Sequence, residues 1–509
     1  MTDETPGKLS YGFAKANGLV ALGGDPAPDD GHVQGAPIRL GTRGTPAPGA
    51  LIEARRALAR PIRLEPVSES RFEQLLGDLY AVDAVDSERL GDDLNDAESL
   101  ESGLDGLPET ADLLDSDDDA PIIRLINGMI AEAVKRRGSD IHVEPFESAL
   151  TIRVRIDGVL QEVLSLPARL APLLVSRIKV MARLDIAEKR LPQDGRISLT
   201  LGGHAIDVRV STLPSRHGER VVLRLLDRDK ALFTVAELGM DPATERRFKA
   251  ALRQPNGVIL VTGPTGSGKT TTLYAGLSLL NEESRNILTV EDPVEYALEG
   301  VGQTQVNPKV GMTFAAGLRA MLRQDPDVVM VGEIRDVETA EIAVQASLTG
   351  HLVLSTVHTN SAVAAVTRLR DMGVEPFLIA SAVKAILAQR LVRRLCPHCK
   401  APVQADAAML ARLGRPADEA RTLYRARGCG HCNQTGYQGR VGLYELVLVD
   451  DTISRLIHDD ARESALQDAA FANAPTLEAS GIDQVLAGET TLEEVLRVIH
   501  QGDSLNTDG

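Results

Sequence analysis

The 509-residue sequence contains no tryptophan, and aromatic residues make up only 3% of it. A core with so few large rings must be built from Leu, Val, Ile and Ala, which suits helices and parallel sheets. No apolar run reaches the roughly 18 residues that cross a bilayer, so no transmembrane helix is expected. The amino-terminal stretch MTDETPGKLS lacks the apolar segment of a secretion signal, so we expect a cytoplasmic protein.

Basic residues are outnumbered, with 55 Lys and Arg against 72 Asp and Glu, which gives a net charge of −17. Residues 82–119 hold 15 acidic residues and one arginine, a net of −14, which leaves −3 for the remainder (−17 minus −14). Such a stretch is typical of a solvated, flexible linker, and an acidic docking tail is the alternative. No nucleic-acid partner is expected, although a basic groove in a nearly neutral domain is compatible with this composition.

The length predicts three or four domains. Residues 1–81 are expected to form a small module with a short helix and turn near 11–20, a Pro- and Gly-rich loop over 24–49 and a helix over 66–81. After the acidic linker, residues 120–232 are predicted to form a mixed α+β domain, with apolar residues at helical spacing over 122–134. Alternating residues predict its strands at 150–159, 195–200, 205–211 and 220–226.

Residues 233–509 begin with an alternation of strands and helices that is typical of a parallel α/β sheet. The apolar strand candidates are 258–261, 287–291, 328–331 and 352–356. Between the first strand and the next helix, residues 263–270 read GPTGSGKT and match the pattern G-x-x-x-x-G-K-[ST]. Such a turn points backbone N–H groups at a phosphate, while Lys269 reaches the β- and γ-phosphates and Thr270 ligates Mg²⁺. The predicted nucleotide-binding residues are Gly263, Pro264, Thr265, Gly266, Ser267, Gly268, Lys269 and Thr270.

Acidic residues follow two of these strands. Glu333 comes two residues after the strand 328–331, which we expect beside the P-loop strand, so that Glu333 lies near the γ-phosphate and Mg²⁺. Its predicted role is to orient or deprotonate the attacking water, and a surface carboxylate is the alternative. Glu291 and Asp292 end another strand and are candidates for positioning water or Mg²⁺. Capping of a helix by Asp292 is the alternative there.

Histidines and arginines lie at further candidate positions. His351 and His358 flank the strand 352–356, but their spacing alone does not make either a catalytic base. Arg209 and Arg224 interrupt apolar runs of two predicted strands. Hydrolysis of a triphosphate develops charge that an arginine of a neighbouring subunit can stabilise. Taken alone, however, the pattern favours a salt-bridged and solvated strand face.

All four cysteines fall into two CxxC pairs separated by 29 residues. In a cytosolic chain this pattern argues for a tetrahedral Zn²⁺ site and against disulfides, with redox cysteines as the alternative. Four protein ligands close the coordination sphere, so the site is predicted to be structural, and the long gap must hold a small subdomain. The predicted ligands are Cys396, Cys399, Cys429 and Cys432.

These segments together resemble the secretion ATPase family of P-loop motors and, within it, the type II secretion ATPases. The resemblance runs from about residue 121 to residue 500 and includes the P-loop and the four cysteines. Its other segments are Ser139–Phe146, Arg190–Arg196, Leu213–Val222, Thr289–Glu295, Gly332–Asp336 and Gly350–Asn360. It implies an α/β fold with a RecA-like P-loop ATPase domain over 233–509 and an inserted Cys₄ zinc subdomain over 395–440. A mixed α+β (PAS-like) domain and the small amino-terminal module would precede it.

The resemblance also implies a function. It is that of a homohexameric ATPase, peripheral on the cytoplasmic face of the inner membrane, that drives a pilus-like piston and exports proteins. The implied partners are the cytoplasmic domain of the inner-membrane L protein, on which residues 1–81 would dock, the inner-membrane platform protein and, indirectly, the anionic membrane surface. Its implied cofactors are ATP, Mg²⁺ and Zn²⁺. The implied site residues are Lys269, Glu333 as Walker B acid, Glu291 as aspartate-box acid, His351 and His358 of the histidine box, and Arg209 and Arg224 as trans-acting arginines, with Arg319 and Arg323 as further candidates.

Three other functions remain open on the sequence. A type IV pilus assembly ATPase has the same chemistry, and the segment Arg216–Arg220 favours secretion over it. A nucleic-acid motor would use the zinc module to grip its track. A nucleotide-gated scaffold would bind ATP without turnover.

Overall fold

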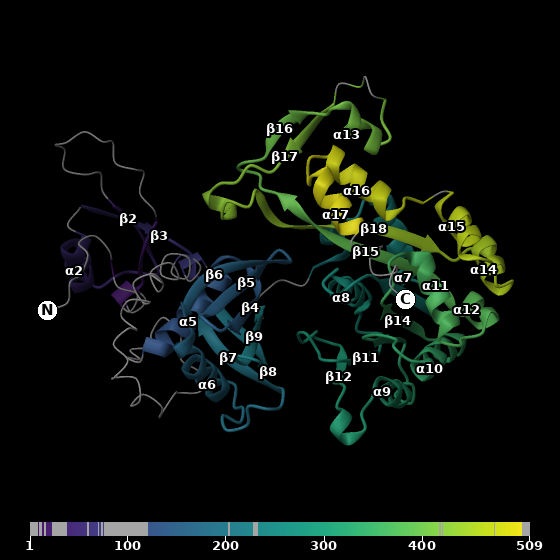
Figure 1. Cartoon of the computed structure of the whole chain (residues 1–509), viewed down its shortest axis with the longest axis horizontal. Helices are drawn as coiled ribbons and strands as arrows, with labels where there is room; N and C mark the ends of the chain where they lie inside the picture. Colours follow the sequence, from purple (N-terminus) through teal and green to yellow (C-terminus); the bar gives the residue numbers. More distant parts are fainter. Residues whose placement is uncertain are drawn as a thin grey trace. The chain divides into compact units, whose positions relative to one another are not determined.

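A computed structural model describes residues 38–58, 61–69, 121–201, 204–227, 233–416, 421–472 and 474–500, together with 9, 13, 14, 17–22, 71, 72, 75 and 419. The chain separates into two compact units, residues 1–230 and 231–509 (Figure 1). The acidic stretch 82–119 lies outside the described residues. Within them, no helix is long and apolar enough to cross a membrane.

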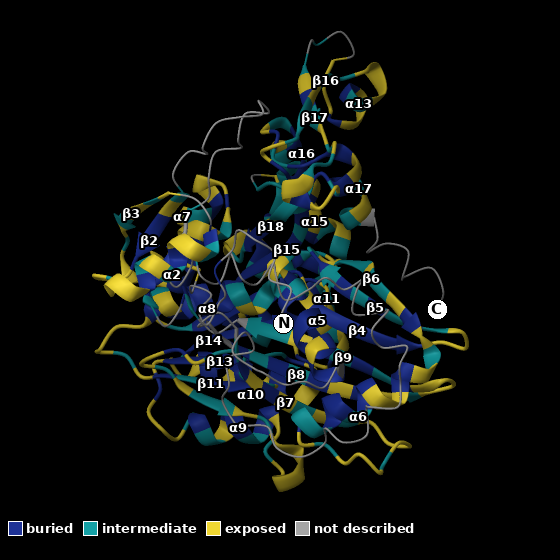
Figure 2. Cartoon of the chain, turned by 90° about the vertical axis from the view of Figure 1, so that its left-hand side faces the viewer, coloured by how far each residue is buried: buried dark blue, intermediate teal, exposed yellow. Residues whose placement is uncertain are grey.

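The amino-terminal module contains a three-stranded sheet of β1 (Leu19–Ala21), β2 (Ile38–Thr42) and β3 (Ile62–Pro66). Helix α2 (Pro48–Leu58) buries Ala50, Ala54 and Leu58 in this module's core and turns its other face to solvent (Figure 2). The loop expected over 24–49 is therefore wrong at β2 and at the start of α2. The short apolar segment of β2 is stabilised because it pairs with β1 on one side and β3 on the other. Residue 66, expected to be helical, still belongs to β3.

The second part of this unit is an antiparallel six-stranded sheet with the order β6-β5-β4-β9-β8-β7. Helices α5 (Pro121–Lys135) and α6 (Ala171–Met181) pack on one face, where Ile141 and Val143 are fully buried. The four strands expected in this region are confirmed as β5, β7, β8 and β9, whereas β4, at the centre of the sheet, and β6, at its edge, were missed. The strands are β4 (Gly138–Pro145), β5 (Ala149–Ile156), β6 (Val159–Pro167), β7 (Gln193–Leu201), β8 (His204–Ser215) and β9 (Gly218–Asp227).

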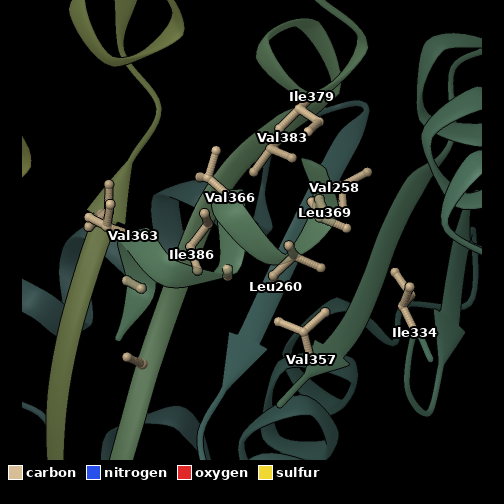
Figure 3. Packing of buried hydrophobic residues seen from close by; sticks show 14 of the residues in the cluster. Val258, Leu260, Ile334, Val357, Val363, Val366, Leu369, Ile379, Val383 and Ile386 are labelled. Carbon is tan, nitrogen blue, oxygen red and sulfur yellow. The ribbon is translucent and has the colours of Figure 1, made fainter. Parts of the chain in front are cut away.

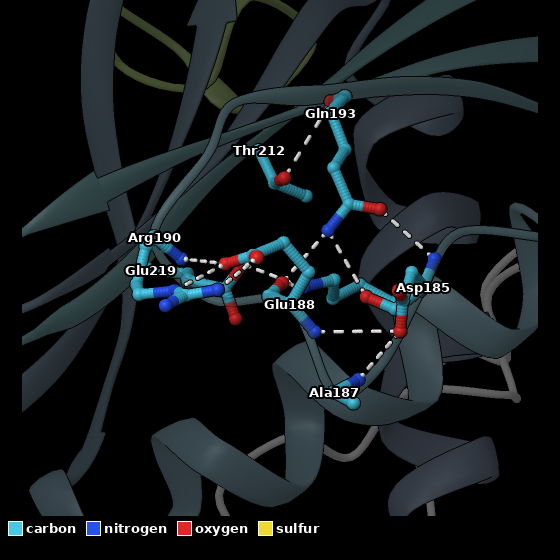
Figure 4. A network of polar contacts seen from close by, with 8 residues as sticks. Asp185, Ala187, Glu188, Arg190, Gln193, Thr212 and Glu219 are labelled. Atoms are coloured by element: carbon cyan, nitrogen blue, oxygen red, sulfur yellow. Dashed lines mark hydrogen bonds and ion pairs between the residues drawn. The ribbon is translucent and has the colours of Figure 1, made fainter.

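A polar network fixes the loop between α6 and β7 (Figure 4). The Gln193 side chain donates to the carbonyl oxygens of Asp185 (3.0 Å) and Glu188 (2.8 Å) and accepts from the Asp185 N–H (2.9 Å). Lys179 Nζ also donates to the carbonyl oxygen of Glu188 and to Glu219 Oε1, both at 2.6 Å. A loop without helix or strand is thereby held by side chains of the elements around it, from α6, β7 and β9.

The second unit is built on a seven-stranded sheet with the order β12-β11-β13-β14-β10-β15-β18. All neighbouring strands are parallel except β18, which runs antiparallel to β15. The four strands expected here are confirmed, whereas β12, β15 and β18 were missed. The strands are β10 (Gly257–Thr262), β11 (Ile287–Glu291), β12 (Gly302–Gln305), β13 (Val328–Val331), β14 (Leu352–Val357), β15 (Val383–Leu395) and β18 (Tyr437–Leu448).

Helices cover both faces of this sheet. On β10, Val258 and Leu260 pack on the side of α10, α11 and α12 (Figure 3), while Ile259 and Val261 pack on the side of α7 and α8. Burial on both faces explains why the strand reads as a continuous apolar run. The helices are α7 (Pro242–Leu252), α8 (Lys269–Leu280), α9 (Phe314–Met321), α10 (Val337–Leu348), α11 (Ala362–Asp371) and α12 (Pro376–Ala382).

A small subdomain separates β15 from β18 and contains β16 (Ala401–Gln404), α13 (Ala407–Arg412) and β17 (Thr422–Arg425). Both CxxC pairs lie at its base. The chain then continues through four helices, of which α16 and α17 pack against β15 and β18. These helices are α14 (Asp451–His458), α15 (Glu463–Phe471), α16 (Leu477–Leu486) and α17 (Leu492–His500).

Candidate functional site

The phosphate-binding loop joins the end of β10 to the start of α8. Gly263 has φ +149°, and a Cβ there would lie 2.5 Å from the carbonyl oxygen of Gln389. Gly268 is left-handed, with φ +89°, and a Cβ there would lie 2.8 Å from Gln389 Nε2. Both positions therefore require glycine. The backbone approaches β15 closely, which explains the first and last glycines of the pattern.

Lys269, the first residue of α8, folds its side chain back over this loop. Its Nζ donates to the carbonyl oxygens of Gly263 (2.8 Å) and Pro264 (3.1 Å). Burial lowers the pKa of Lys269 to about 8, with nearby Glu333 opposing that shift and Arg390 adding to it. Ser267 Oγ is buried and has no hydrogen-bond partner among the described residues, as expected of a polar group that serves a ligand. Thr270 is exposed and free to meet a metal ion. The residues of the loop therefore fit a nucleotide phosphate with Mg²⁺.

Glu333 lies close to this loop, but not for the reason expected. Strand β14 separates β13 from β10, so the expectation that Glu333 follows a strand directly beside the P-loop strand is wrong. The carboxylate nevertheless contributes to the pKa of Lys269. Its oxygens make an ion pair with Arg335 and lie 3.6 Å from His358 Nε2. With 14% of its side chain exposed, Glu333 keeps limited access to solvent.

The two candidate histidines lie at opposite ends of β14. His358 follows the carboxyl end, near Glu333, and burial lowers its pKa, with Lys269 and Arg335 adding to the shift. His351 precedes the amino end, where its Nδ1 lies 2.9 Å from the carbonyl oxygen of Ala346. A six-residue strand separates the two rings by about 20 Å. Only His358 therefore belongs to the cluster around Glu333.

Glu291, at the end of β11, is buried in a network of its own. One carboxylate oxygen accepts from the Tyr274 hydroxyl, and the other accepts from Thr289 Oγ1 (2.5 Å) and Gln303 Nε2 (3.1 Å). Tyr274 belongs to α8, so Glu291 is tied to the helix that carries Lys269. No helix begins directly after Asp292, where the described residues 293–301 form bends and turns, so the capping role considered for it is wrong.

Arg209 and Arg224 lie in the other unit, on one row across the six-stranded sheet. The row runs Arg155, Asp140, Arg224, Arg209, Arg196 from β5 to β7. Arg224 Nε bonds Asp140 Oδ1 at 2.9 Å, and 57% of the arginine side chain is exposed. A row with four arginines and one carboxylate is strongly cationic, and like charges placed directly opposite cost stability.

Two further arginine candidates lie near the carboxyl end of α9. Arg319 bonds Glu338 of α10 at 2.6 Å, and Arg323 follows in the next turn and is exposed. The roles of all four arginines in hydrolysis stay predictions.

The four cysteines meet in one cluster. The Sγ–Sγ distances are 3.9 Å (Cys396–Cys429), 3.8 Å (Cys399–Cys432) and 3.7 Å (Cys429–Cys432). Zinc holds thiolates at about 2.3 Å, which gives tetrahedral edges of about 3.8 Å, so the cluster fits that ion. Although burial opposes it, N–H donors from Cys429 and Gly436 (3.2 Å each) help lower the pKa of Cys432 to about 7. Such donors favour the thiolate that a metal requires.

Comparison with known families decides what kind of molecule this is. A model described as "Type II/IV secretion system protein" matches residues 115–497, more than half of the chain. The chain belongs to the type II/IV secretion system protein family. A second model, which describes an amino-terminal domain of "GSPII protein E", matches residues 8–80. The resemblance noted in the sequence is thereby confirmed.

Curated members of this family are similar over nearly the whole chain. The type II secretion system ATPase E of Vibrio cholerae is 57% identical over 450 residues, covering 88% of this chain and 90% of that protein. The type II secretion system protein E of Pseudomonas aeruginosa is 55% identical over 496 residues, covering 97% of each.

Solved structures support the fold. The Legionella pneumophila ATPase DotB has a TM-score of 0.56 at 19% identity, covering 78% of this chain and 98% of DotB. The pilus retraction motor PilT with bound ADP has a TM-score of 0.50 at 26% identity, covering 72% and 95%. The expected fold class is confirmed, with a P-loop α/β domain that carries a Cys₄ insertion, preceded by a mixed α+β domain and an amino-terminal module.

Several residues of the site escaped sequence reasoning. Gln389 and Arg390 reach the site from β15, Arg335 pairs with Glu333, and Tyr274 binds Glu291. Only one signal pointed to any of them. The polar pair Gln389-Arg390 interrupts an otherwise apolar run, which indicates buried polar groups with a specific purpose.

Proposed function

We propose that this chain is the ATP-hydrolysing motor of a type II secretion system, which powers pseudopilus assembly and protein export across the outer membrane. The observation that carries the proposal is the cluster at the carboxyl edge of the seven-stranded sheet. There Lys269 folds over the P-loop and Glu333 meets Arg335 and His358. The high identity to the proteins of Vibrio cholerae and Pseudomonas aeruginosa favours secretion over pilus assembly.

In this proposal the loop from Gly263 to Thr270 binds the triphosphate of ATP. Backbone N–H groups and the amino end of α8 face the phosphates, and Lys269, largely charged at pH 7, adds a cation. The Thr270 hydroxyl would hold Mg²⁺, which neutralises charge on the phosphates when bound. Glu333 orients the attacking water and accepts its proton. Arg335 and His358 fix the direction of its carboxylate.

The two acids have different surroundings, and this difference suggests different roles. Both oxygens of Glu291 already accept hydrogen bonds from Tyr274, Thr289 and Gln303. With both oxygens engaged and only 3% of the residue exposed, this carboxylate holds its neighbours in place and has little access to an attacking water. We therefore assign general-base chemistry to Glu333 and a positioning role to Glu291. Arg209 and Arg224 of a neighbouring subunit would complete the site by stabilising charge on the transferred phosphoryl group.

The proposal extends to the wider assembly that the family resemblance implies. The chain would form a homohexamer on the cytoplasmic face of the inner membrane, where residues 1–81 bind the cytoplasmic domain of the L protein. The platform protein and the anionic membrane surface would be its other neighbours. Residues 82–119 would serve as the linker to the ATPase-associated domain at 120–232 and the ATPase domain at 233–509. Cys396, Cys399, Cys429 and Cys432 would hold one structural Zn²⁺ within 395–440.

The decisive test is which partner stimulates hydrolysis of ATP by the full-length chain. We expect activation by the cytoplasmic domain of the L protein together with vesicles containing anionic lipid. Activation by single-stranded nucleic acid, with none by that mixture, would instead identify a nucleic-acid motor. Activation by the equivalent component of a pilus system alone would identify a pilus assembly ATPase. Tight ATP binding with no phosphate release under any of these conditions would identify a nucleotide-gated scaffold.

A further inference from the structure

Two consecutive polar residues on β15, Gln389 and Arg390, are almost completely buried, at 2% and 3% exposure. The last residue of β10, Thr262, pairs with Ala388, so the two lie beside the point where the P-loop leaves the sheet. Successive strand residues point to opposite faces, so Gln389 faces α8 and Arg390 faces the segment before α11. Burying an amide and a guanidinium is costly unless both are hydrogen-bonded, so their partners indicate why they are there.

Gln389 lies against both ends of the phosphate-binding loop. Its Oε1 accepts from Thr272 Oγ1 (2.7 Å), a fully buried hydroxyl in the first turn of α8. Its carbonyl oxygen and its Nε2 occupy the places where side chains at Gly263 and Gly268 would lie. The loop is thus bonded to β15 at the start of its helix and held by close approach at its two glycines. A displacement of Gln389 would release the loop that positions Lys269.

Arg390 holds the segment that precedes α11, which lies on the other face of β15. Its guanidinium donates to the carbonyl oxygen (2.9 Å) and to Oδ1 (3.2 Å) of Asn360. Asn360 closes a short segment in which His358 lies near Glu333 and the Thr359 N–H donates to Thr262 Oγ1 (2.9 Å). The arginine therefore fixes the segment that brings His358 to the candidate general base. Its charge also acts on Lys269.

We propose that Gln389 and Arg390 are positioning residues for the reaction, Gln389 for the phosphate-binding loop and Arg390 for the segment that carries His358. Neither needs to touch the nucleotide. Because they are neighbours on one strand, a single rigid element sets the separation between the loop that binds phosphate and the segment that faces Glu333. This inference rests on the proposed ATPase activity.

The test uses the full-length chain and measures equilibrium binding of a fluorescent ATP analogue, kcat and KM for ATP, and the melting temperature. Gln389→Leu removes the acceptor for Thr272 and is expected to weaken nucleotide binding about 5- to 10-fold. The variant Thr272→Val removes the donor instead. If that bond carries the effect, the double variant binds as weakly as either single variant and the losses do not multiply.

For Arg390 the conservative variant separates positioning from charge. Arg390→Lys keeps the cation but has one nitrogen, so it cannot donate both to Asn360 and to the Gln389 carbonyl oxygen (3.2 Å) as the two guanidinium nitrogens do. We therefore expect nucleotide affinity within about twofold of wild type and kcat lower by about tenfold. Arg390→Met loses both. Arg394→Met is the matched control, because Arg394 lies on the same strand, is more than half exposed and pairs with Glu489. It should leave binding and turnover unchanged.

Wild-type affinity and turnover in folded Gln389→Leu and Arg390→Met would overturn the inference. So would multiplying losses in the Thr272 pair, or a wild-type kcat in Arg390→Lys beside a loss in Arg390→Met, because the charge alone would then carry the effect. If a leucine or methionine variant fails to fold, Thr272→Val and Arg390→Lys replace it, and unchanged binding and kcat in both would have the same meaning. A wild-type protein that binds nucleotide without hydrolysing it would defeat the proposed function alone, since the binding measurements still test Gln389.

Discussion

Burial lowers the pKa of Lys269, the lysine of the P-loop, to about 8. Burial favours its neutral form, while the proposed ligand, a triphosphate, favours the charged form. Glu333 partly offsets the cost of burial, so the lysine stays mostly charged near neutral pH without a ligand. The nucleotide must supply the rest of the stabilisation. Affinity for ATP should therefore depend on the protonation of this side chain.

We predict that ATP binding weakens as pH rises through about 8. Binding of phosphate raises the pKa of Lys269, so proton uptake accompanies binding above the free-state value, and the Kd rises by up to about tenfold per pH unit. Below about pH 7 the lysine is charged in both states and its contribution is constant. Lys269→Arg removes the titration. A titration of Kd between pH 6.5 and 9.5 that is steep for both proteins, or flat for both, would refute this assignment.

At this scale the sequence predicts the residues of local patterns well. Gly263, Lys269 and Thr270 are recognisable because the phosphate-binding loop is one continuous segment, so their spacing along the chain identifies it. Gln389 was not predicted, because its role depends on β15 lying next to β10, more than 120 residues away in the chain. Tyr274 was missed for a related reason, since an apolar helical pattern does not reveal that its hydroxyl meets Glu291.

At the scale of helices and strands, alternation and apolar runs predicted most of the strands of the two large sheets but not their order. Glu333 was expected beside the P-loop strand, and β14 lies between them. Glu333 nevertheless lies near the P-loop, because neighbouring parallel strands all end at the same edge of the sheet. The missed strands have weaker patterns. Strand β12 is short and polar, while β15 and β18 carry charged residues that bind partners distant in sequence, such as Arg393 to Glu494.

Helix α17 is attached to β15 through the carboxylate of Glu494. Glu494, with 1% of its side chain exposed, accepts from Arg393 and Arg497, and although burial opposes them these bonds lower its pKa to about 2. We predict that Glu494→Gln destabilises the fold by about 2–3 kcal/mol at pH 7. The ionised carboxylate stabilises the fold fully above pH 4.5, and this stabilisation is lost as pH falls toward 2. The difference in free energy of unfolding between variant and wild type should therefore shrink with acidification. Denaturant unfolding at several pH values measures this difference, and a difference that does not change with pH would contradict the prediction.

The cysteine subdomain is the second element open to test. We predict one zinc ion per chain by elemental analysis, lost in Cys396→Ser. This variant should lower the melting temperature and weaken partner binding, because the base of the subdomain loses its ligand set. ATP binding should survive, since the P-loop lies on a different part of the sheet. Loss of ATP binding, or a full zinc content in Cys396→Ser, would argue against a separate structural metal site.

For the whole molecule, the distribution of charge suggests how subunits cooperate. The row that includes Arg209 and Arg224 places arginines directly opposite each other, an arrangement that an anion would stabilise. In the proposed ring that anion is the nucleotide of a neighbouring subunit. Pattern reasoning alone favoured a salt-bridged face, which Arg224 and Asp140 do form. A single sequence carries no information about what a neighbouring copy places there.

Mixing two inactive variants tests this cooperation. Arg224→Ala should lose at least about 100-fold in kcat while still binding ATP, and Lys269→Ala should lose ATP binding. If the arginine acts across subunits, mixed rings regain activity, because an intact P-loop then meets an intact arginine. No recovery in a mixture shown by sizing to contain both chains would place the arginine in cis or outside the reaction.

The central claim is that the chain hydrolyses ATP at the P-loop with Glu333 as the base, and Glu333→Gln tests it most directly. The amide keeps the size of the side chain and can still face Arg335 and His358, but it cannot accept a proton. The measurement is phosphate release alongside ATP affinity on the same assembled protein. The account predicts affinity within about threefold of wild type and turnover lower by at least about 100-fold. Phosphate release at the wild-type rate would contradict it.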